Sequence, residues 1–250
     1  MIKKQIPNAI TLLNLVCGCL AIISTFHKTF ELTAVLVVMA AVLDFFDGFA
    51  ARMLKVHSEM GKQLDSLADM VTFGVVPGFV MYQLIIFAIG SGSAYIGHDE
   101  PVWYLAYTAM LIPVFSAYRL AKFNIDTRQS DSFIGVPTPA NALFICFLPM
   151  LMIPDGNAIA EFLLKPYVLI AICIILSYLM IAEIPLIALK FKNFTLKGNE
   201  WRYALIILTF IMLILLKLKA VPLIIILYVI LSLLQNSLSK PNLSSNKNEI

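Results

Sequence analysis

Apolar stretches of roughly 17–24 residues recur along the whole chain, and they constrain its fold more than any other feature. A helix of this length can cross a lipid bilayer, where it satisfies all of its own backbone hydrogen bonds. Only 13% of the residues are charged, whereas an average soluble domain has about 25%. The sequence therefore predicts an all-α protein, a polytopic membrane bundle of about eight transmembrane helices.

The predicted spans follow one another with short connections. Their approximate ranges are 9–26, 31–53, 66–90, 102–121, 138–154, 166–189, 202–217 and 219–236. Only residues 217–222 separate the last two, so one bent helix or a re-entrant hairpin is the alternative for that pair.

Composition divides the chain into three parts. Residues 1–192 hold six spans and are predicted to form one catalytic core. Residues 193–236 add two accessory spans that contain almost no polar residues. Residues 237–250 are rich in Ser, Asn and Lys, which is typical of a disordered, solvated tail.

The basic residues predict the orientation in the membrane. With a cytoplasmic N-terminus, 14 of the 18 Lys and Arg residues fall on the cytoplasmic side, and the exceptions are Lys28, Lys165, Lys217 and Lys219. This positive-inside bias predicts a multi-pass protein of the cytoplasmic (cell) membrane, with its N-terminus facing the cytoplasm. The net charge of +3 follows from the same bias and does not indicate nucleic-acid binding.

Four aspartates lie at the predicted cytoplasmic margins of the second and third spans. They are Asp44, Asp47, Asp65 and Asp69. A carboxylate near lipid costs about 2.5 kcal/mol or more, and clustered carboxylates repel one another. Spacings of three and four residues place each pair on one helix face, and the short link 53–60 lets the two faces meet. Such a cluster predicts a site for a hard divalent cation, Mg²⁺, Mn²⁺ or Ca²⁺.

Small residues accompany the aspartates on the same helix faces. Gly48, Ala51 and Gly61 would leave a notch for a nucleotide or phosphate, although small residues also allow close helix packing. Arg52 could pair with a phosphate oxygen or anchor the helix at the cytoplasmic face.

Polar residues recur every three positions on the first span. Asn8, Thr11 and Asn14 could contact the nucleotide or a metal-bound water. Isolated polar residues in membrane spans also bond to neighbouring helices, which is the alternative.

The complete string D-x-x-D-G-x-x-A-R-(x8)-G-x-x-x-D-x-x-x-D runs from Asp44 to Asp69. It resembles the signature of the CDP-alcohol phosphotransferase family of integral membrane enzymes. The resemblance implies a six-helix core, a homodimer and a centre of one or two metal ions held by the four aspartates, with Asp69 also acting as general base. It further implies a CDP-linked donor bound beside Gly48, Ala51, Arg52 and Gly61, and Asn8 and Thr11 are predicted to contact the same donor.

Four further stretches are similar to membrane-embedded phosphatidylserine synthases. They are residues 6–18, 64–77, 118–124 and 133–139. This resemblance implies transfer of a phosphatidyl group from CDP-diacylglycerol to the hydroxyl of L-serine, with release of CMP and with Mn²⁺ or Mg²⁺ as cofactor. Glycerol 3-phosphate, inositol or inositol phosphate are the alternative acceptors. An ion-coupled transporter is the alternative of another class, because intramembrane acids also bind transported ions.

Serine carries a carboxylate and an ammonium group, so its pocket should offer a cation near the metals. Arg119, Lys122 and Asn124 lie at the predicted cytoplasmic end of the fourth span, and an Arg–carboxylate pair would be bidentate. Arg119 and Lys122 could instead only anchor the helix. Thr72 lies one turn beyond Asp69 and is predicted to line the acceptor pocket.

Overall fold

The computed structural model describes residues 2–56, 58–91, 101–126, 133–152, 158–187, 195 and 199–238. Within these ranges the chain is almost entirely helical, which confirms the predicted all-α membrane bundle. By length and composition, four helical stretches can cross a membrane: Gln5–Phe26, Phe30–Met53, Glu59–Gly90 and Glu200–Leu238. Two further helices, Thr138–Met152 and Pro166–Ile181, are also apolar but shorter.

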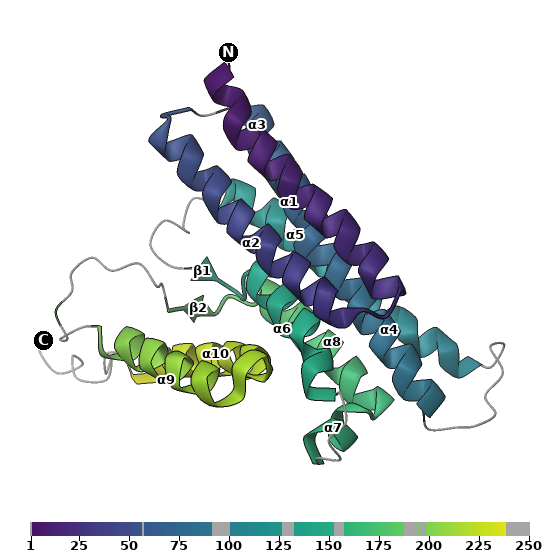
Figure 1. The fold of residues 1–250 in the computed structure, drawn as a ribbon. Coiled ribbons are helices and arrows are strands. Elements are labelled where there is room, and N and C mark those ends of the chain that lie inside the picture. The colour runs from purple at the N-terminus through teal and green to yellow at the C-terminus, as the bar shows by residue number, and fades with distance from the viewer. Residues whose placement is uncertain are drawn as a thin grey trace, which may run out of the picture.

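The N-terminal pair consists of α1 (Ile2–Phe26) and α2 (Phe30–Met53), which pack against each other along their length. The chain reverses between them at Lys28, whose φ of 59° is in the left-handed region. Hydrogen bonds between Ser24 and Thr29 close this turn. The N-terminal end of α1 and the C-terminal end of α2 lie at the top of Figure 1, where the site described below is found.

The third predicted span is longer than expected and is not a uniform helix. It consists of α3 (Glu59–Asp69), the π-helical turn η1 (Met70–Val75) and α4 (Val76–Ser91). The prediction began this span at residue 66, but the Ser58 side chain caps the helix by accepting a hydrogen bond of 2.9 Å from the Gly61 N–H. The π-helical turn begins directly after Asp69, and such turns often occur at functional sites.

The remaining elements complete the bundle. They are η2 (Pro101–Met110), α5 (Leu111–Ile125), β1 (Phe133–Ile134), α6 (Thr138–Met152), α7 (Ala158–Leu163), α8 (Pro166–Ile181), β2 (Pro185–Leu186), α9 (Glu200–Leu216), η3 (Lys217–Lys219) and α10 (Ala220–Leu238). The predicted span 102–121 is therefore 3₁₀ in its first half. The span predicted to end at residue 189 ends at Ile181, because the chain then pairs β2 with β1 in antiparallel fashion.

The last two predicted spans are separate helices. Lys217 has a φ of 51° and breaks the helix, and α9 and α10 then pack against each other, while α10 also packs against α6. Figure 1 shows this pair to one side of the long helices, at an angle to their direction. Helix α10 continues to Leu238, two residues into the predicted tail, and residues 239–250 lie outside the described part.

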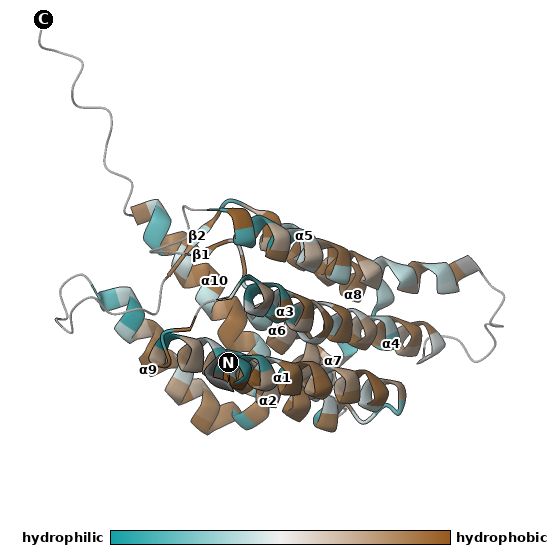
Figure 2. Cartoon of the chain, turned by 90° about the horizontal axis from the view of Figure 1, so that it is seen from above, coloured by the Kyte–Doolittle hydropathy of each residue, from teal (hydrophilic) through white to brown (hydrophobic). Residues whose placement is uncertain are grey.

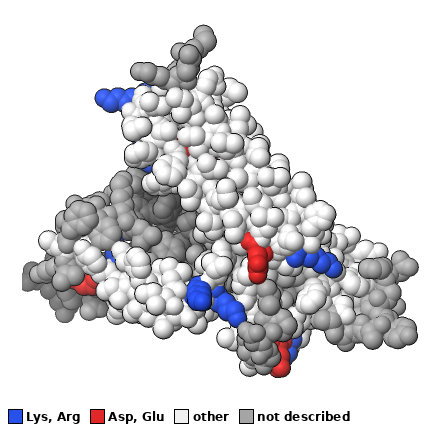
Figure 3. All heavy atoms as spheres, in the orientation of Figure 1, with Lys and Arg blue, Asp and Glu red and all other residues white. Residues whose placement is uncertain are grey.

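The main core lies among α1, α2, α4, α6 and α8. Phe73, Met81, Ile85, Ile145 and Leu169 are fully buried there. Many large hydrophobic side chains are exposed on the outside of the bundle, among them Phe45, Ile174 and Leu215. The helices of Figure 2 are accordingly largely brown. On the face drawn in Figure 3 most described atoms belong to uncharged residues. Such an extended apolar exterior is expected where helices face lipid.

Candidate active site

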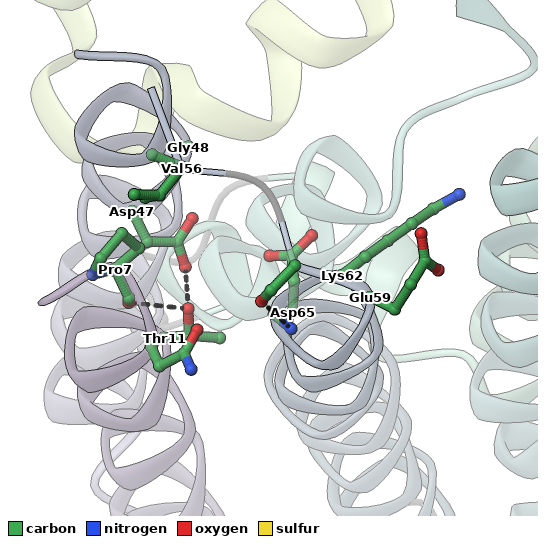
Figure 4. A pocket seen from close by; sticks show the side chains of 12 residues that line it. Pro7, Thr11, Asp47, Gly48, Val56, Glu59, Lys62 and Asp65 are labelled. Atoms are coloured by element: carbon green, nitrogen blue, oxygen red, sulfur yellow. Dashed lines mark hydrogen bonds between the residues drawn. The ribbon is translucent and has the colours of Figure 1, made fainter. Parts of the chain in front are cut away.

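A cavity opens where α1, α2 and α3 meet, at the end of the bundle that holds the α2–α3 link. Its volume is about 500 Å³, within the usual range of small-molecule sites, about 300–1,000 Å³. It is lined by Pro7, Asn8, Thr11, Asp47, Gly48, Ala51, Val56, Ser58, Glu59, Gly61, Lys62 and Asp65. Figure 4 shows Asp47 and Asp65 on opposite sides of the cavity, facing each other.

Three of the four predicted aspartates form a compact cluster. Asp44, Asp47 and Asp65 each place a carboxylate oxygen within 4.8 Å of the others. They meet because Asp44 and Asp47 share one face of α2 and the short link returns α3 alongside it. Asp69 is buried one turn beyond Asp65.

The cluster fits a divalent metal ion. Oxygen ligands lie about 2.0–2.6 Å from Mg²⁺ or Ca²⁺, so ligands of one ion are separated by about 5 Å or less. In addition, Oδ1 of Asp65 is buried and has no hydrogen-bond partner among the described residues. Carboxylates this close repel one another unless a cation or protons neutralise them. Asp44, Asp47 and Asp65 could therefore hold a metal ion together.

Thr11 orients the first of these carboxylates. Its hydroxyl lies 2.6 Å from Oδ2 of Asp47 and 3.1 Å from the carbonyl oxygen of Pro7, and its single proton can serve one acceptor at a time. The shorter contact is the one to the carboxylate, as expected for a charge-assisted hydrogen bond. Thr11, predicted to contact the donor, thus lines the cavity and also holds Asp47 in position.

Asn14 plays the corresponding part for Asp69. Its Nδ2 donates to Oδ1 of Asp69 over 3.2 Å, a contact that the sequence did not predict. The hydroxyl of Thr72 donates to the Asn14 backbone carbonyl over 3.3 Å. A Cβ atom on Gly18 would lie only 2.4 Å from the same hydroxyl, so glycine is required for this approach of α1 to η1. Thr72, predicted to line the acceptor pocket, is fully buried at this helix contact.

The small residues of the motif, Gly48, Ala51 and Gly61, all line the cavity. A Cβ atom on Gly48 would meet no other atom within 4 Å, so this position faces open space in the cavity. Gly61 is needed for close approach, because its Cβ would lie 2.9 Å from Oγ of Ser58 and 3.1 Å from Oδ1 of Asn8. Arg52 is exposed and is not among the lining residues.

Three of the four residues predicted to bind serine, those on α5, do not converge. Arg119 is buried on α5 and interacts electrostatically with Asp69. Lys122 instead forms an ion pair of 3.3 Å with Glu183, and Asn124 donates to Oγ of Ser66 over 2.7 Å. These partners come from other elements, which the spacing along one helix could not reveal. Of these three residues, Arg119 is the one whose charge interacts with an aspartate of the motif.

A second, much smaller cavity lies beside Arg119. Its volume is about 10 Å³, room for about one water molecule. It is lined by Arg119, Lys122, Phe123, Ile134, Met180 and Ile181. This cavity is therefore too small to hold serine unless some of these side chains are displaced.

Several lining residues of the main cavity were not predicted as site residues. Pro7, Val56, Ser58 and Glu59 belong to this group, as does Lys62, whose Nζ donates to the Asn124 carbonyl over 2.8 Å. Lys62 is three residues before Asp65, so helical spacing was the signal that could have placed it at the site.

Comparison with known proteins supports the motif. The model of the CDP-alcohol phosphatidyltransferase family matches residues 4–177, from α1 to most of α8. A CDP-diacylglycerol–serine O-phosphatidyltransferase from Bacillus subtilis is 34% identical over 197 residues, which cover 79% of this chain and 95% of the relative. An enzyme of that name from Helicobacter pylori is 33% identical over 213 residues, 83% of this chain and 79% of the relative.

A more distant relative of the same name comes from Methanocaldococcus jannaschii. It is 31% identical over 140 residues, which cover 56% of this chain and 58% of the relative. The family predicted from the aspartate motif is thereby confirmed. The chain belongs to the CDP-alcohol phosphatidyltransferase family.

Proposed function

We propose that this chain is a CDP-diacylglycerol–serine O-phosphatidyltransferase that produces phosphatidylserine and CMP. The serine hydroxyl attacks the phosphorus atom that bears the lipid, a new P–O bond forms, and the P–O bond to CMP breaks. The proton of the hydroxyl passes to an enzyme carboxylate. The observation that carries the proposal is the three-carboxylate cluster, two members of which line a cavity of about 500 Å³, in a chain whose relatives bear this name.

The metal centre is assigned to the four aspartates of the motif, with Mg²⁺ or Mn²⁺ as the ion and Ca²⁺ as a further ion that this donor set accepts. When bound, one or two such ions neutralise the pyrophosphate and stabilise the departing CMP. Thr11 supports this assignment because it orients Asp47, and the unpaired Oδ1 of Asp65 supports it as a free ligand atom.

Asp69 is proposed as the general base, in addition to its place at the metal centre. It is buried, so water does not compete strongly for its carboxylate. The hydrogen bond from Asn14 fixes its orientation. A base that is held in one orientation can accept the serine proton as the hydroxyl attacks.

The CDP group of the donor is assigned to the main cavity. Gly48 and Ala51 leave the wall open, Asn8 and Thr11 offer polar groups, and Lys62 supplies a positive charge. Arg52, which is exposed and does not line the cavity, is proposed to pair with a phosphate oxygen of the donor.

The lipid chains of the donor would lie in the bilayer against the apolar outer surface. The N-terminus and the site face the cytoplasm in this proposal, because most Lys and Arg residues then lie inside. Residues 1–192 form the catalytic core, residues 193–236 the accessory helices, and the protein acts as a homodimer.

The decisive experiment is an acceptor screen. Purified protein in detergent is incubated with CDP-diacylglycerol, Mn²⁺ or Mg²⁺, and either serine, glycerol 3-phosphate, inositol or inositol phosphate, and CMP release is measured. We expect release with serine alone. Release only with another acceptor would contradict the choice of serine, and ion flux into vesicles without any CMP release would favour a transporter.

Filling the cavity at Gly48 should block the donor. Gly48→Leu is expected to raise the KM for CDP-diacylglycerol at least about tenfold, equivalent to about 1.4 kcal/mol, because the new side chain projects into open space. Gly90→Leu is the matched control, because replacing glycine by leucine favours a helix by up to about 1 kcal/mol at either position. Gly90 lies at the C-terminal end of α4, away from the cavity. Equal KM values for both variants would show that the donor does not approach Gly48.

Removing the guanidinium group of Arg119 should weaken the binding of serine. Arg119→Ala is expected to raise the KM for serine roughly ten- to a hundredfold, the effect of losing a hydrogen bond to a charged group. Lys165→Ala removes a positive charge at the N-terminal end of α8. It is the control and should leave this KM unchanged. An unchanged KM in Arg119→Ala would return Arg119 to a role in anchoring the helix.

A further inference from the structure

Asn14 presents an unused hydrogen-bond acceptor beside Asp69. The side chain is completely buried, and its Nδ2 donates to Oδ1 of Asp69. Its other polar atom, Oδ1, is also buried and has no hydrogen-bond partner among the described residues. A buried carbonyl oxygen without a partner is destabilising, so such an atom in a native site calls for a ligand or a water molecule.

Arg119 presents an unused donor near the same carboxylate. Its Nε is buried and unpaired among the described residues, and the guanidinium interacts electrostatically with Asp69. Helix α1, which carries Asn14, and helix α5, which carries Arg119, both pack against η1, the turn that follows Asp69. The two helices that pack against the turn after Asp69 therefore each carry a buried, unsatisfied polar atom, an uncharged acceptor on α1 and a cationic donor on α5.

We propose that Asn14 determines specificity for an amino acid acceptor, with its Oδ1 accepting a hydrogen bond from the α-ammonium group of serine. This inference rests on the proposed function. The hydroxyl oxygen and the ammonium nitrogen of serine are separated by only two carbon atoms. When the hydroxyl lies at Asp69, the ammonium group is within reach of the amide that already touches that carboxylate. The serine carboxylate then points to Arg119.

This arrangement also explains why other acceptors would be excluded. Glycerol 3-phosphate, inositol and inositol phosphate carry no ammonium group, so each could offer Oδ1 of Asn14 only a neutral hydroxyl. A hydrogen bond from a charged donor is stronger than one from a neutral hydroxyl, so these acceptors would be bound less tightly at this position. Asn14 would thus both orient Asp69 and select the acceptor.

The test separates these two roles by comparing substrates that lack one charged group. The acceptors are serine, ethanolamine, which lacks the carboxylate, and 3-hydroxypropionate, which lacks the ammonium group. For each protein the ratio of kcat/KM values is measured, so that a general loss of activity cancels. We expect the wild type to prefer serine over 3-hydroxypropionate by about ten- to a hundredfold, the effect of one hydrogen bond to a charged group.

Two substitutions at the same position provide the contrast. Asn14→Leu has a similar shape but neither donor nor acceptor, and should bring the serine/3-hydroxypropionate ratio close to one. Asn14→Asp keeps an acceptor and loses the donor, so kcat should fall while the ratio is retained. Arg119→Ala should lower only the serine/ethanolamine ratio. Thr33→Val, at a buried position at the far end of α2, should change neither ratio.

The measured ratios test whether Asn14 binds the ammonium group of serine. An unchanged ratio in Asn14→Leu, or a wild type that does not distinguish serine from 3-hydroxypropionate, would show that Asn14 only positions Asp69 or binds water. If Asn14→Leu does not fold, as judged by thermal unfolding, Asn14→Ala gives the same comparison. Serine should raise the unfolding temperature of the wild type more than 3-hydroxypropionate does, independently of turnover. Absence of CMP release from the wild type with serine would refute the proposed function instead.

Discussion

Asp69→Asn is expected to lower the rate of CMP release by roughly 10²–10⁴-fold, the usual contribution of a general base. The amide has the same shape as the carboxylate but cannot accept the serine proton. The variant should fold normally, because one charge fewer reduces the repulsion within the aspartate cluster. Thermal unfolding checks the fold, and binding of CDP-diacylglycerol and of Mn²⁺ checks that the remaining three aspartates still form the site.

The control for this variant is Glu31→Gln, the same change at an exposed acid on the far end of α2. It should leave CMP release and unfolding unchanged. Activity of Asp69→Asn within a few-fold of the wild type would remove Asp69 as the base. A variant that loses metal binding completely would show instead that Asp69 acts mainly as a ligand.

Removing divalent metal should abolish CMP release and also destabilise the protein. Asp44, Asp47 and Asp65 have oxygens within 4.8 Å of one another, so their charges repel when no cation is present. A metal ion at a hundred times its Kd would stabilise the folded state by about 2.7 kcal/mol. Addition of EDTA should therefore lower the unfolding temperature, and Mn²⁺ or Mg²⁺ in excess should restore both stability and activity.

Asp65→Asn tests whether this stabilisation arises at the aspartate cluster. Because one charge is gone, the metal-free variant should unfold at a higher temperature than the metal-free wild type. Its further increase on addition of Mn²⁺ should be smaller, since one ligand is lost. An EDTA-treated wild type that keeps its activity and its unfolding temperature would rule out a metal at this site.

Much of the site could be predicted because its geometry is local. The intervals Asp44–Asp47 and Asp65–Asp69 correspond to helical periods, so each pair lies on one helix face whatever the rest of the fold. The short α2–α3 link leaves the two helices no arrangement other than side by side. The apolar runs likewise predicted the bundle, because the length of a run is enough to identify a possible span.

The contacts between distant elements could not be predicted in this way. Which residue of α1 meets Asp69 depends on how far α1 is rotated and shifted relative to α3, and the close contact of Gly18 with Thr72 decides it. The result is that Asn14 reaches Asp69, although its spacing from Asn8 and Thr11 indicated only a shared face.

The sequence by itself determined the membrane-spanning helical architecture, the family and the aspartate cluster, since these depend on the length of apolar runs and on spacing along one or two neighbouring helices. Only the tertiary structure decided which polar residues act together around the cluster. It directs Lys122 to Glu183 and Asn124 to Ser66, and it buries Arg119 where its charge interacts with that of Asp69. The physical reason is that a buried polar side chain bonds to whichever partner the packing brings within reach, and that packing is set by the whole bundle.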